Sequence, residues 1–145
     1  AEACVHHLWF SDQDYKKLGA KIKWNPAIKS EMNQKGLFDA LHNGKLDIIA
    51  TDHAPHTIEE KTGNYFQAMS GGPIVQHALP ALLEMYHQNK LTLEMIVEKT
   101  AHNVAETYKL KERGYIREGY YADLVLVDIN QSWKVTKENI LYKCK

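Results

Sequence analysis

Cysteine, net charge and long apolar runs are what this sequence lacks most visibly. Its 145 residues include two cysteines, Cys4 and Cys144, which lie at opposite ends of the chain without metal-ligand spacing. Two unpaired thiols are typical of a reducing compartment, so we expect a cytoplasmic protein. Basic and acidic residues both number 18, so no excess charge attracts nucleic acid or an anionic membrane.

The apolar runs are too short to cross a bilayer. The opening stretch AEACVHHLWF has neither the basic leader nor the cleavage site of a signal peptide. It begins without methionine and resembles a strand from the middle of a fold. We therefore expect the chain to be part of a longer protein, one with small-molecule partners rather than a nucleic acid or a membrane.

The first half of the chain predicts strands alternating with helices. A strand is expected over residues 2–10, followed by a short helix that Ser11 and Asp14 would cap and Gly19 would end. Ser30 is expected to cap a helix that runs to about Asn43 and stops at Gly44.

A second strand is expected at LDIIAT, residues 46–51, because a continuous apolar run of this length is typical of a strand buried on both faces. Two parallel strands cannot form a stable sheet alone, which favours a part of a larger parallel sheet or barrel.

The second half predicts helices and then small strands. Pro73 suits a first helical position, and a further amphipathic helix is expected from about Thr92 to Tyr108. Turn glycines at 114 and 119 separate β-branched runs, which predicts short antiparallel strands in the last third of the chain.

The most informative stretch is IATDHAPHTIEEK, residues 49–61, because Asp52 follows directly on the second strand. In a β/α barrel the reactive side chains lie at the carboxyl ends of the strands. A carboxylate there can bind a divalent metal or carry a proton, and the His56 imidazole could hold an anionic group. The alternative is that Asp52 caps the next segment while His53 and His56 are solvated loop residues.

Polar residues also follow the first expected strand. His6 and His7 could be metal ligands, although packing or support of a ligand is the more ordinary role of such a pair. Asn25 could bind an amide-like ligand or simply form an Asx turn before Pro26. A catalytic zinc needs about three protein ligands, and Asp52 is the one convincing candidate, so the other ligands would lie outside this chain.

Residues 50–61 resemble the dihydroorotase signature of the amidohydrolase superfamily. The matching residues are Ala50, Thr51, Asp52, Ala54, Pro55, His56 and Lys61. The stretches CVHHLWF, KWNPAIKS, SGGPIVQHALPALLE and GYIREGYYADLVLVD support the resemblance in the order in which the family has them.

The resemblance implies an α/β fold, namely the C-terminal part of an eight-stranded (β/α) barrel whose last two strands are present, with part of a small β-sandwich domain. Residues 1–110 would belong to the barrel and residues 111–145 to the β domain. It further implies a zinc-dependent enzyme with two metal ions that interconverts dihydroorotate and N-carbamoyl-aspartate in pyrimidine synthesis.

By the same resemblance, Asp52 would be a metal ligand and the general base and acid. The substrate-binding residues would be Asn25, His56, Ser70 and Gly71. The family's first-strand His-x-His, the fourth-strand group that bridges the metals and the histidines of strands five and six are absent here. His6 and His7 are therefore not assigned as ligands.

Three alternatives remain. Another cyclic amidohydrolase, an allantoinase or a dihydropyrimidinase, is disfavoured because those families tend to change the residues after the aspartate. A catalytically inactive assembly subunit would lack the missing metal ligands altogether. A free-standing interaction module would expose apolar faces, so it would have to dimerise or pair with the missing part. For the chain as given we expect a homo-oligomer or a self-associated fragment.

Overall fold

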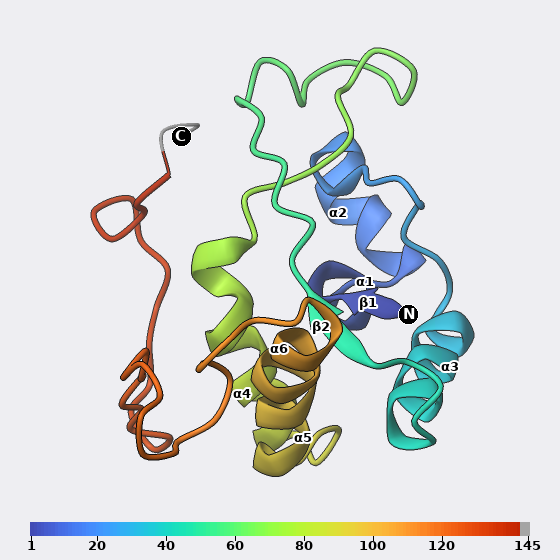
Figure 1. Cartoon of the computed structure of the whole chain (residues 1–145). Helices are drawn as coiled ribbons and strands as arrows, with labels where there is room; N and C mark the ends of the chain where they lie inside the picture. The colour runs from blue at the N-terminus through green and yellow to red at the C-terminus, as the bar shows by residue number, and fades with distance from the viewer. Residues whose placement is uncertain (143–145) are drawn as a thin grey trace.

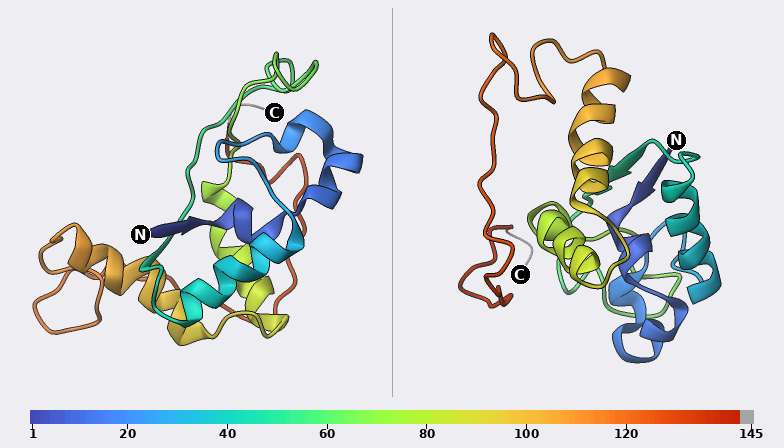
Figure 2. Two further views of the ribbon diagram at one scale, coloured as in Figure 1. Left: turned by 90° about the vertical axis from the view of Figure 1, so that its right-hand side faces the viewer. Right: turned by 90° about the horizontal axis from the view of Figure 1, so that it is seen from below.

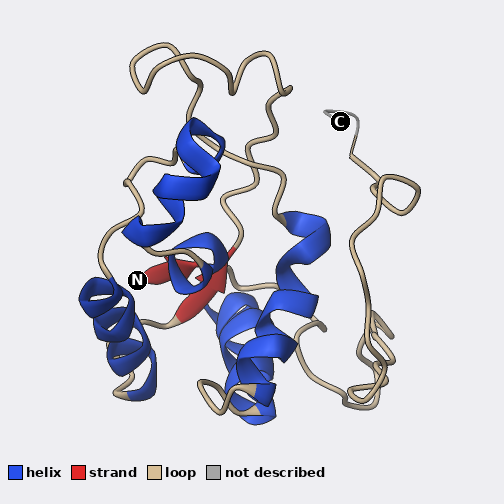
Figure 3. Cartoon of the chain, turned by 180° about the vertical axis from the view of Figure 1, so that it is seen from behind, coloured by secondary structure: helices blue, strands red, loops and turns tan. Residues whose placement is uncertain are grey.

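The fold is built around two short parallel strands, β1 (Glu2–Cys4) and β2 (Ile48–Ala50). The computed structural model describes residues 1–142. Figure 3 shows the strands at the centre, with helices around them. Cα partners in the ladder are Glu2 with Ile48, Ala3 with Ile49, and Cys4 with Ala50. The predicted parallel pairing is confirmed, and buried Ala3, Ile48 and Ile49 give it the expected apolar character.

The first strand is shorter than predicted. The expected strand over residues 2–10 ends at Cys4, and the chain turns into the helix α1 (Val5–Trp9), which the Phe10 N–H closes by donating to the His6 carbonyl at 3.0 Å. Val5 and Leu8 are three residues apart and both buried, which is helical rather than strand spacing. The prediction was wrong because β2 offers a ladder partner for three residues only.

The connection between the strands follows the predicted helix boundaries, although the Ser30 side chain makes no capping hydrogen bond. Ser11 and Asp14 form the expected capping box of η1 (Asp12–Asp14), and α2 (Tyr15–Leu18) leads into η2 (Gly19–Ile22) at Gly19, whose φ is 54°. The helix α3 (Glu31–His42) then begins after Ser30 and ends before Gly44, whose φ is 68°. Both predicted stops rest on the tolerance of glycine for positive φ.

The second half is helical up to Thr107. After Pro73, which lies before the first helical residue rather than within the helix, come η3 (Val75–His77) and α4 (Ala78–His87). The helix predicted from Thr92 is continuous, with Thr92 Oγ1 accepting from the Met95 N–H at 3.1 Å. It comprises α5 (Leu93–Val97), the π-helical turn η4 (Glu98–His102) and α6 (Asn103–Thr107).

The main core joins the two strands to the helices that surround them (Figure 1). Its buried members are Ala3, Val5, Leu8, Phe38, Leu41, Ile49, Leu82, Met85, Leu91 and Ile96. A smaller cluster of Ile22, Trp24 and Ile28 belongs to the connection between α2 and α3. None of the helices in residues 1–142 is long and apolar enough to cross a membrane.

The last third does not contain the predicted strands. Residues 108–142 have turns but no strand, and Figures 1 and 2 show them as an irregular trace beside the helices. The predicted turn glycines are correct, with φ of 83° at Gly114 and 79° at Gly119. The β-branched runs are exposed, with Val125 at 75% and Leu126 at 101%. A strand forms only against a partner strand, and residues 108–142 supply none. Residues 143–145 lie outside the described part.

The core assignment predicts a large difference between two leucines. Leu41→Ala removes a side chain that is 1% exposed, so it should lower the free energy of unfolding by about 2–5 kcal/mol. Leu126→Ala is the matched control. Because Leu126 is exposed to solvent, this substitution should leave the free energy of unfolding, measured by urea titration, unchanged. An equal loss in both variants would mean that the last third packs against the core.

Candidate functional site

The site begins where the two strands end. β1 and β2 are parallel, so the carboxyl end of β1 at Cys4 lies beside the end of β2 at Ala50. Asp52 follows two residues later, exposed, with a φ of 45°. Burial raises the pKa of the Cys4 thiol to about 11, and the neighbouring carboxylates of Asp52 and Glu2 add to the shift. The negative charges of Asp52 and Glu2 therefore act on the thiol at the end of β1.

A left-handed conformation is uncommon for a residue other than glycine and marks backbone that its surroundings hold in place. At Asp52 those surroundings are the contacts of the two residues that follow it. His53 forms a parallel bridge with Gly72, and the Ala54 N–H donates to the Gly72 carbonyl at 3.2 Å. His53 Nδ1 accepts from the Val75 N–H at 3.1 Å. The loop that leaves β2 thus returns to its own starting point.

The structure brings His56 and Ser70 together, two of the predicted substrate-binding residues. His56 Nε2 donates to the Ser70 carbonyl at 3.0 Å, and Nδ1 lies 3.3 Å from Glu60 Oε2. Glu60 Oε2 also accepts from the Thr57 N–H at 2.9 Å. Hydrogen bonds from Thr57 and His56 keep the pKa of Glu60 below its usual value. The ring is therefore fixed in orientation before any ligand arrives.

Gly71 and Gly72 form a turn that no other residue fits. Gly71 has a φ of 123°, and a Cβ there would lie 2.6 Å from both Cβ and the carbonyl oxygen of Ala54. A Cβ on Gly72 would lie 2.5 Å from the Trp24 ring. The Gly71 N–H donates to the Lys23 carbonyl at 2.9 Å. This turn therefore sits directly against the segment that carries Asn25.

Asn25 is exposed at the turn before Pro26. The structure places its backbone one residue after Trp24 and two after Lys23, the residues that contact the glycine turn. The predicted site residues thus come from three loops. The loop of residues 52–61 carries Asp52 and His56, the turn carries Ser70 and Gly71, and the third loop carries Asn25.

Lys61 is the last residue of the motif at residues 50–61, and the sequence alone assigns it no role. It is 7% exposed, and its ammonium donates to three backbone carbonyls, those of Lys23, Met69 and Gly71. Burial, with a smaller contribution from the Lys23 cation, lowers the pKa of Lys61 to about 8. The fixed spacing between His56 and Lys61 was the one sequence signal for a role of this lysine. The signal does not identify the carbonyl partners, because Lys23 lies far in the sequence from Met69 and Gly71.

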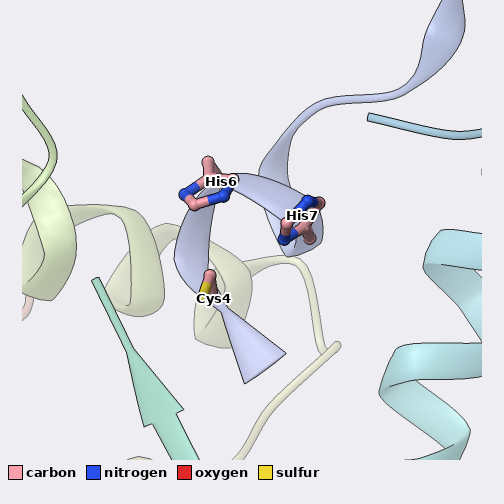
Figure 4. Close-up of side chains that lie close together, drawn as sticks. All are labelled: Cys4, His6 and His7. Atoms are coloured by element: carbon pink, nitrogen blue, oxygen red, sulfur yellow. The ribbon is translucent and has the colours of Figure 1, made fainter. Parts of the chain in front are cut away.

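The possible metal ligands do not gather around Asp52. Within residues 1–142, the one group of three or more converging donors is Cys4, His6 and His7, whose ligand atoms lie within 4.8 Å of one another (Figure 4). Tetrahedral zinc with bonds of about 2.0–2.3 Å brings its ligand atoms to roughly 3.5 Å. His6 also stacks on Trp24, with ring centroids 4.4 Å apart and planes 9° from parallel. As it stands, this cluster is a packed histidine pair beside a thiol.

A metal at Asp52 would therefore need ligands from elsewhere. The described residues supply one carboxylate, whereas a catalytic zinc takes about three protein ligands. Residues 1–142 alone do not bring three such ligands together at Asp52. That the remaining ligands lie outside the chain stays a prediction.

The chain belongs to the amidohydrolase family, whose model matches residues 2–142. It is similar to the dihydroorotase of Halobacterium salinarum, with 39% identity over 99% of this chain and 34% of that protein. It is also similar to the allantoinase of Desulfitobacterium hafniense strain Y51, with 33% identity over 99% of this chain and 32% of that protein. The chain thus spans about a third of the length of the curated relatives it matches.

Among solved structures, the L-hydantoinase (dihydropyrimidinase) from Arthrobacter aurescens superposes with a TM-score of 0.79 and 25% identity over 83% of this chain and 28% of that chain. The predicted resemblance is confirmed, and the chain shares its fold with part of this amidohydrolase-type structure. The eight-stranded barrel stays a prediction. The proposed division at residue 110 and the β-sandwich remain predictions.

The glycine turn predicts opposite effects of the same substitution at two sites. Gly71→Ala places a Cβ against Ala54 in a backbone region that costs other residues about 1–3 kcal/mol. Hydrogen exchange at the Ala54 amide should accelerate. Gly36→Ala is the control, because this glycine lies inside α3 with open space around it, so it should stabilise the chain by about 0.5–1 kcal/mol. Unchanged Ala54 exchange in Gly71→Ala would contradict the turn geometry.

Buried His6 predicts acid sensitivity. It is fully buried, and neither ring nitrogen has a hydrogen bond of good geometry within the described residues. Burial and neighbouring His7 lower its pKa from 6.5 to about 3, against a smaller opposing effect of the Thr51 backbone. The unfolded chain therefore binds the extra proton between these pH values, and stability falls as pH falls, by at most about 1.4 kcal/mol per unit. Urea titrations should show a shallower pH dependence in His6→Phe. If stability depended on pH equally in the wild type and in His6→Phe, His6 would not be a buried neutral imidazole in the folded chain.

Proposed function

We propose that these residues form the substrate-binding and proton-transfer part of a dihydroorotase. This enzyme interconverts dihydroorotate and N-carbamoyl-aspartate in pyrimidine synthesis and acts as part of a longer protein. The observation that carries the proposal is the gathering of the motif at one sheet edge. Asp52 leaves the end of β2, while His56 is hydrogen bonded to the Ser70 carbonyl. The 39% identity to a dihydroorotase supports the substrate class.

Asp52 is the proposed proton carrier. Its carboxylate is exposed at the strand end and is held in a left-handed backbone conformation. Opening a cyclic amide requires a base that takes a proton from the attacking water and an acid that returns it to the departing ring nitrogen. One carboxylate can perform both steps in turn.

The substrate carboxylate and ring are assigned to the three loops. The substrate carboxylate would replace exposed Glu60 as the partner of His56 Nδ1, while Nε2 stays on the Ser70 carbonyl. The Asn25 amide can both donate and accept. At the glycine turn, the Gly71 N–H and carbonyl are already engaged by Lys23 and Lys61. The N–H and hydroxyl of Ser70 are therefore the groups that the turn would present, while Gly71 gives the turn its shape.

Zinc belongs to the proposal through the family resemblance, which implies two ions. A bound divalent ion would supply Lewis-acid chemistry at the amide carbonyl. Asp52 would be the contribution of this chain to the metal site. The outer edges of β1 and β2 have no ladder partner within residues 1–142, so we also propose that the isolated chain self-associates.

A second candidate has support of its own. Allantoinases match the same span at up to 33% identity, and a hydantoinase shares the fold. All three names describe opening of a cyclic amide, so the choice concerns the substrate and not the reaction type. The intact Ala54-Pro55-His56 with Lys61 favours dihydroorotate.

The test is a chimera in which this chain replaces the matching third of the Halobacterium salinarum dihydroorotase. We expect it to open dihydroorotate in preference to allantoin or hydantoin, and the chain alone to be inactive. Asp52→Asn should cost at least 10³-fold in turnover, about 4 kcal/mol or more. A monodisperse chimera that preferred allantoin would refute the substrate. An Asp52→Asn variant with a tenth of normal turnover would refute the role of Asp52.

A further inference from the structure

Lys61 lies where the three site loops meet. Its Nζ is 3.0 Å from the Lys23 carbonyl oxygen, 2.9 Å from that of Met69 and 2.8 Å from that of Gly71. An ammonium has three N–H donors, so these three carbonyls saturate it. The residue is 7% exposed, and a cation buried to this degree is tolerated only when it is fully hydrogen bonded.

The three carbonyls come from both neighbours of Ser70 and from the loop of Asn25. Met69 and Gly71 flank Ser70 directly, and Lys23 precedes Asn25 by two residues. Lys61 itself follows His56 by five residues, within a turn closed by hydrogen bonds from the Lys61 N–H to the Thr57 and Ile58 carbonyls at 3.1 and 3.2 Å. One ammonium thus connects all three proposed substrate-binding segments.

The Trp24 ring packs against both Lys61 and the glycine turn. The centroid of this ring lies 5.6 Å from Lys61 Nζ. The ring also stacks on His6 and leaves no room for a Cβ on Gly72. The ammonium therefore also receives a favourable contact with an aromatic face. Movement of the glycine turn away from Lys61 would break hydrogen bonds and open a gap over this ring.

A second lysine holds a different part of the same loop. Lys23 Nζ donates to the carbonyls of Tyr65 and Ala68, both at 2.6 Å. These residues belong to the loop tip and not to the turn at Ser70 and Gly71. The two lysines therefore hold different segments of the loop. Removal of the Lys23 side chain should release residues 65–68, and removal of the Lys61 side chain should release the turn at Ser70 and Gly71.

We propose that Lys61 is a positioning residue that fixes the Ser70–Gly71 turn and the Asn25 segment relative to His56. The proposal rests on the proposed function as far as the ligand is concerned, since those residues are the ones assigned to dihydroorotate. Lys61 has no free donor left for a ligand and acts through the three backbone carbonyls. Without it, the carbonyls of Lys23, Met69 and Gly71 lose a charged donor in a buried place.

The first test is hydrogen exchange on the chain itself, at a pH below the Lys61 pKa of about 8. Lys61→Met keeps the length of the side chain and removes its donors. We expect exchange of the Gly71 amide, which donates to the Lys23 carbonyl, to accelerate by about tenfold or more, equivalent to about 1.4 kcal/mol. Lys23→Met should accelerate exchange at the loop tip and spare Gly71. Lys45→Met, at an exposed lysine, should change neither.

A chemical rescue separates positioning from a general loss of structure. Lys61→Cys, unfolded, treated with 2-bromoethylamine and refolded, regains an ammonium at nearly the original position, with identically treated wild type as the control for Cys4 and Cys144. Restored Gly71 protection supports the proposal. Wild-type protection of Gly71 in Lys61→Met overturns it, and so does loss of protection that the rescue does not reverse.

The ligand is tested separately, in the chimera. Lys61→Met should raise KM for dihydroorotate about tenfold or more while kcat changes far less, because binding groups are misplaced and Asp52 is not. Accelerated Gly71 exchange with an unchanged KM would overturn the role in substrate binding. If wild-type chimera does not act on dihydroorotate but Gly71 exchange responds as expected, the proposed function fails and the positioning of the turn stands.

Discussion

The pairing of β1 with β2 is the constraint on which the rest of the structure depends. The ladder contains three residue pairs, yet it decides which chain ends face each other. Because the strands are parallel, both carboxyl ends lie at one edge, and Cys4 and Asp52 come within electrostatic reach of each other. The helices complete the arrangement by covering the strands with Leu8, Leu41 and Leu82.

Closing the long loop after β2 is the second constraint. Residues 51–74 contain no helix or strand, and an irregular loop of this length is costly to order. The structure orders it with polar contacts to backbone, at the His53–Gly72 bridge, the His56–Ser70 hydrogen bond and the three carbonyls bound by Lys61. Buried backbone groups are satisfied in this way without a sheet. The same contacts fix the side chains that would bind a ligand.

The sequence predicted those elements whose causes are local. The helix α3 begins after Ser30 and ends before Gly44, and Thr92 caps α5. The apolar run before Asp52 contains the strand β2. Prediction from the sequence failed where the outcome depends on a partner. Residues 5–9 have strand-like composition but lack a ladder partner, and the β-branched runs around Leu126 have no second strand to pair with in residues 1–142. Propensity cannot tell whether the partner is present.

The candidate site shows the same division. Asp52 and His56 could be identified because they stand in one short motif, and the site loops could be inferred only through a family resemblance. The role of Lys61 could not be read from the sequence, since its carbonyl partners at positions 23, 69 and 71 are defined by the tertiary fold alone. Every residue type has a backbone carbonyl, so the sequence does not show which carbonyls accept hydrogen bonds from Lys61.

Binding and metal chemistry are unequally represented in this chain. It holds every residue assigned to the substrate and the proposed proton carrier, but one of the several ligands that a zinc site requires. The proposed binding groups are held in place by contacts internal to residues 1–142, above all by the hydrogen bonds of Lys61. A metal site cannot be preorganised in the same way, because Asp52 has no converging donors among these residues. Under the proposed function, the two parts of the chemistry would therefore depend on different parts of a longer protein. Substrate recognition would be set by this chain, and activation of the attacking water would arise only when the end of β2 meets ligands from the rest of the barrel.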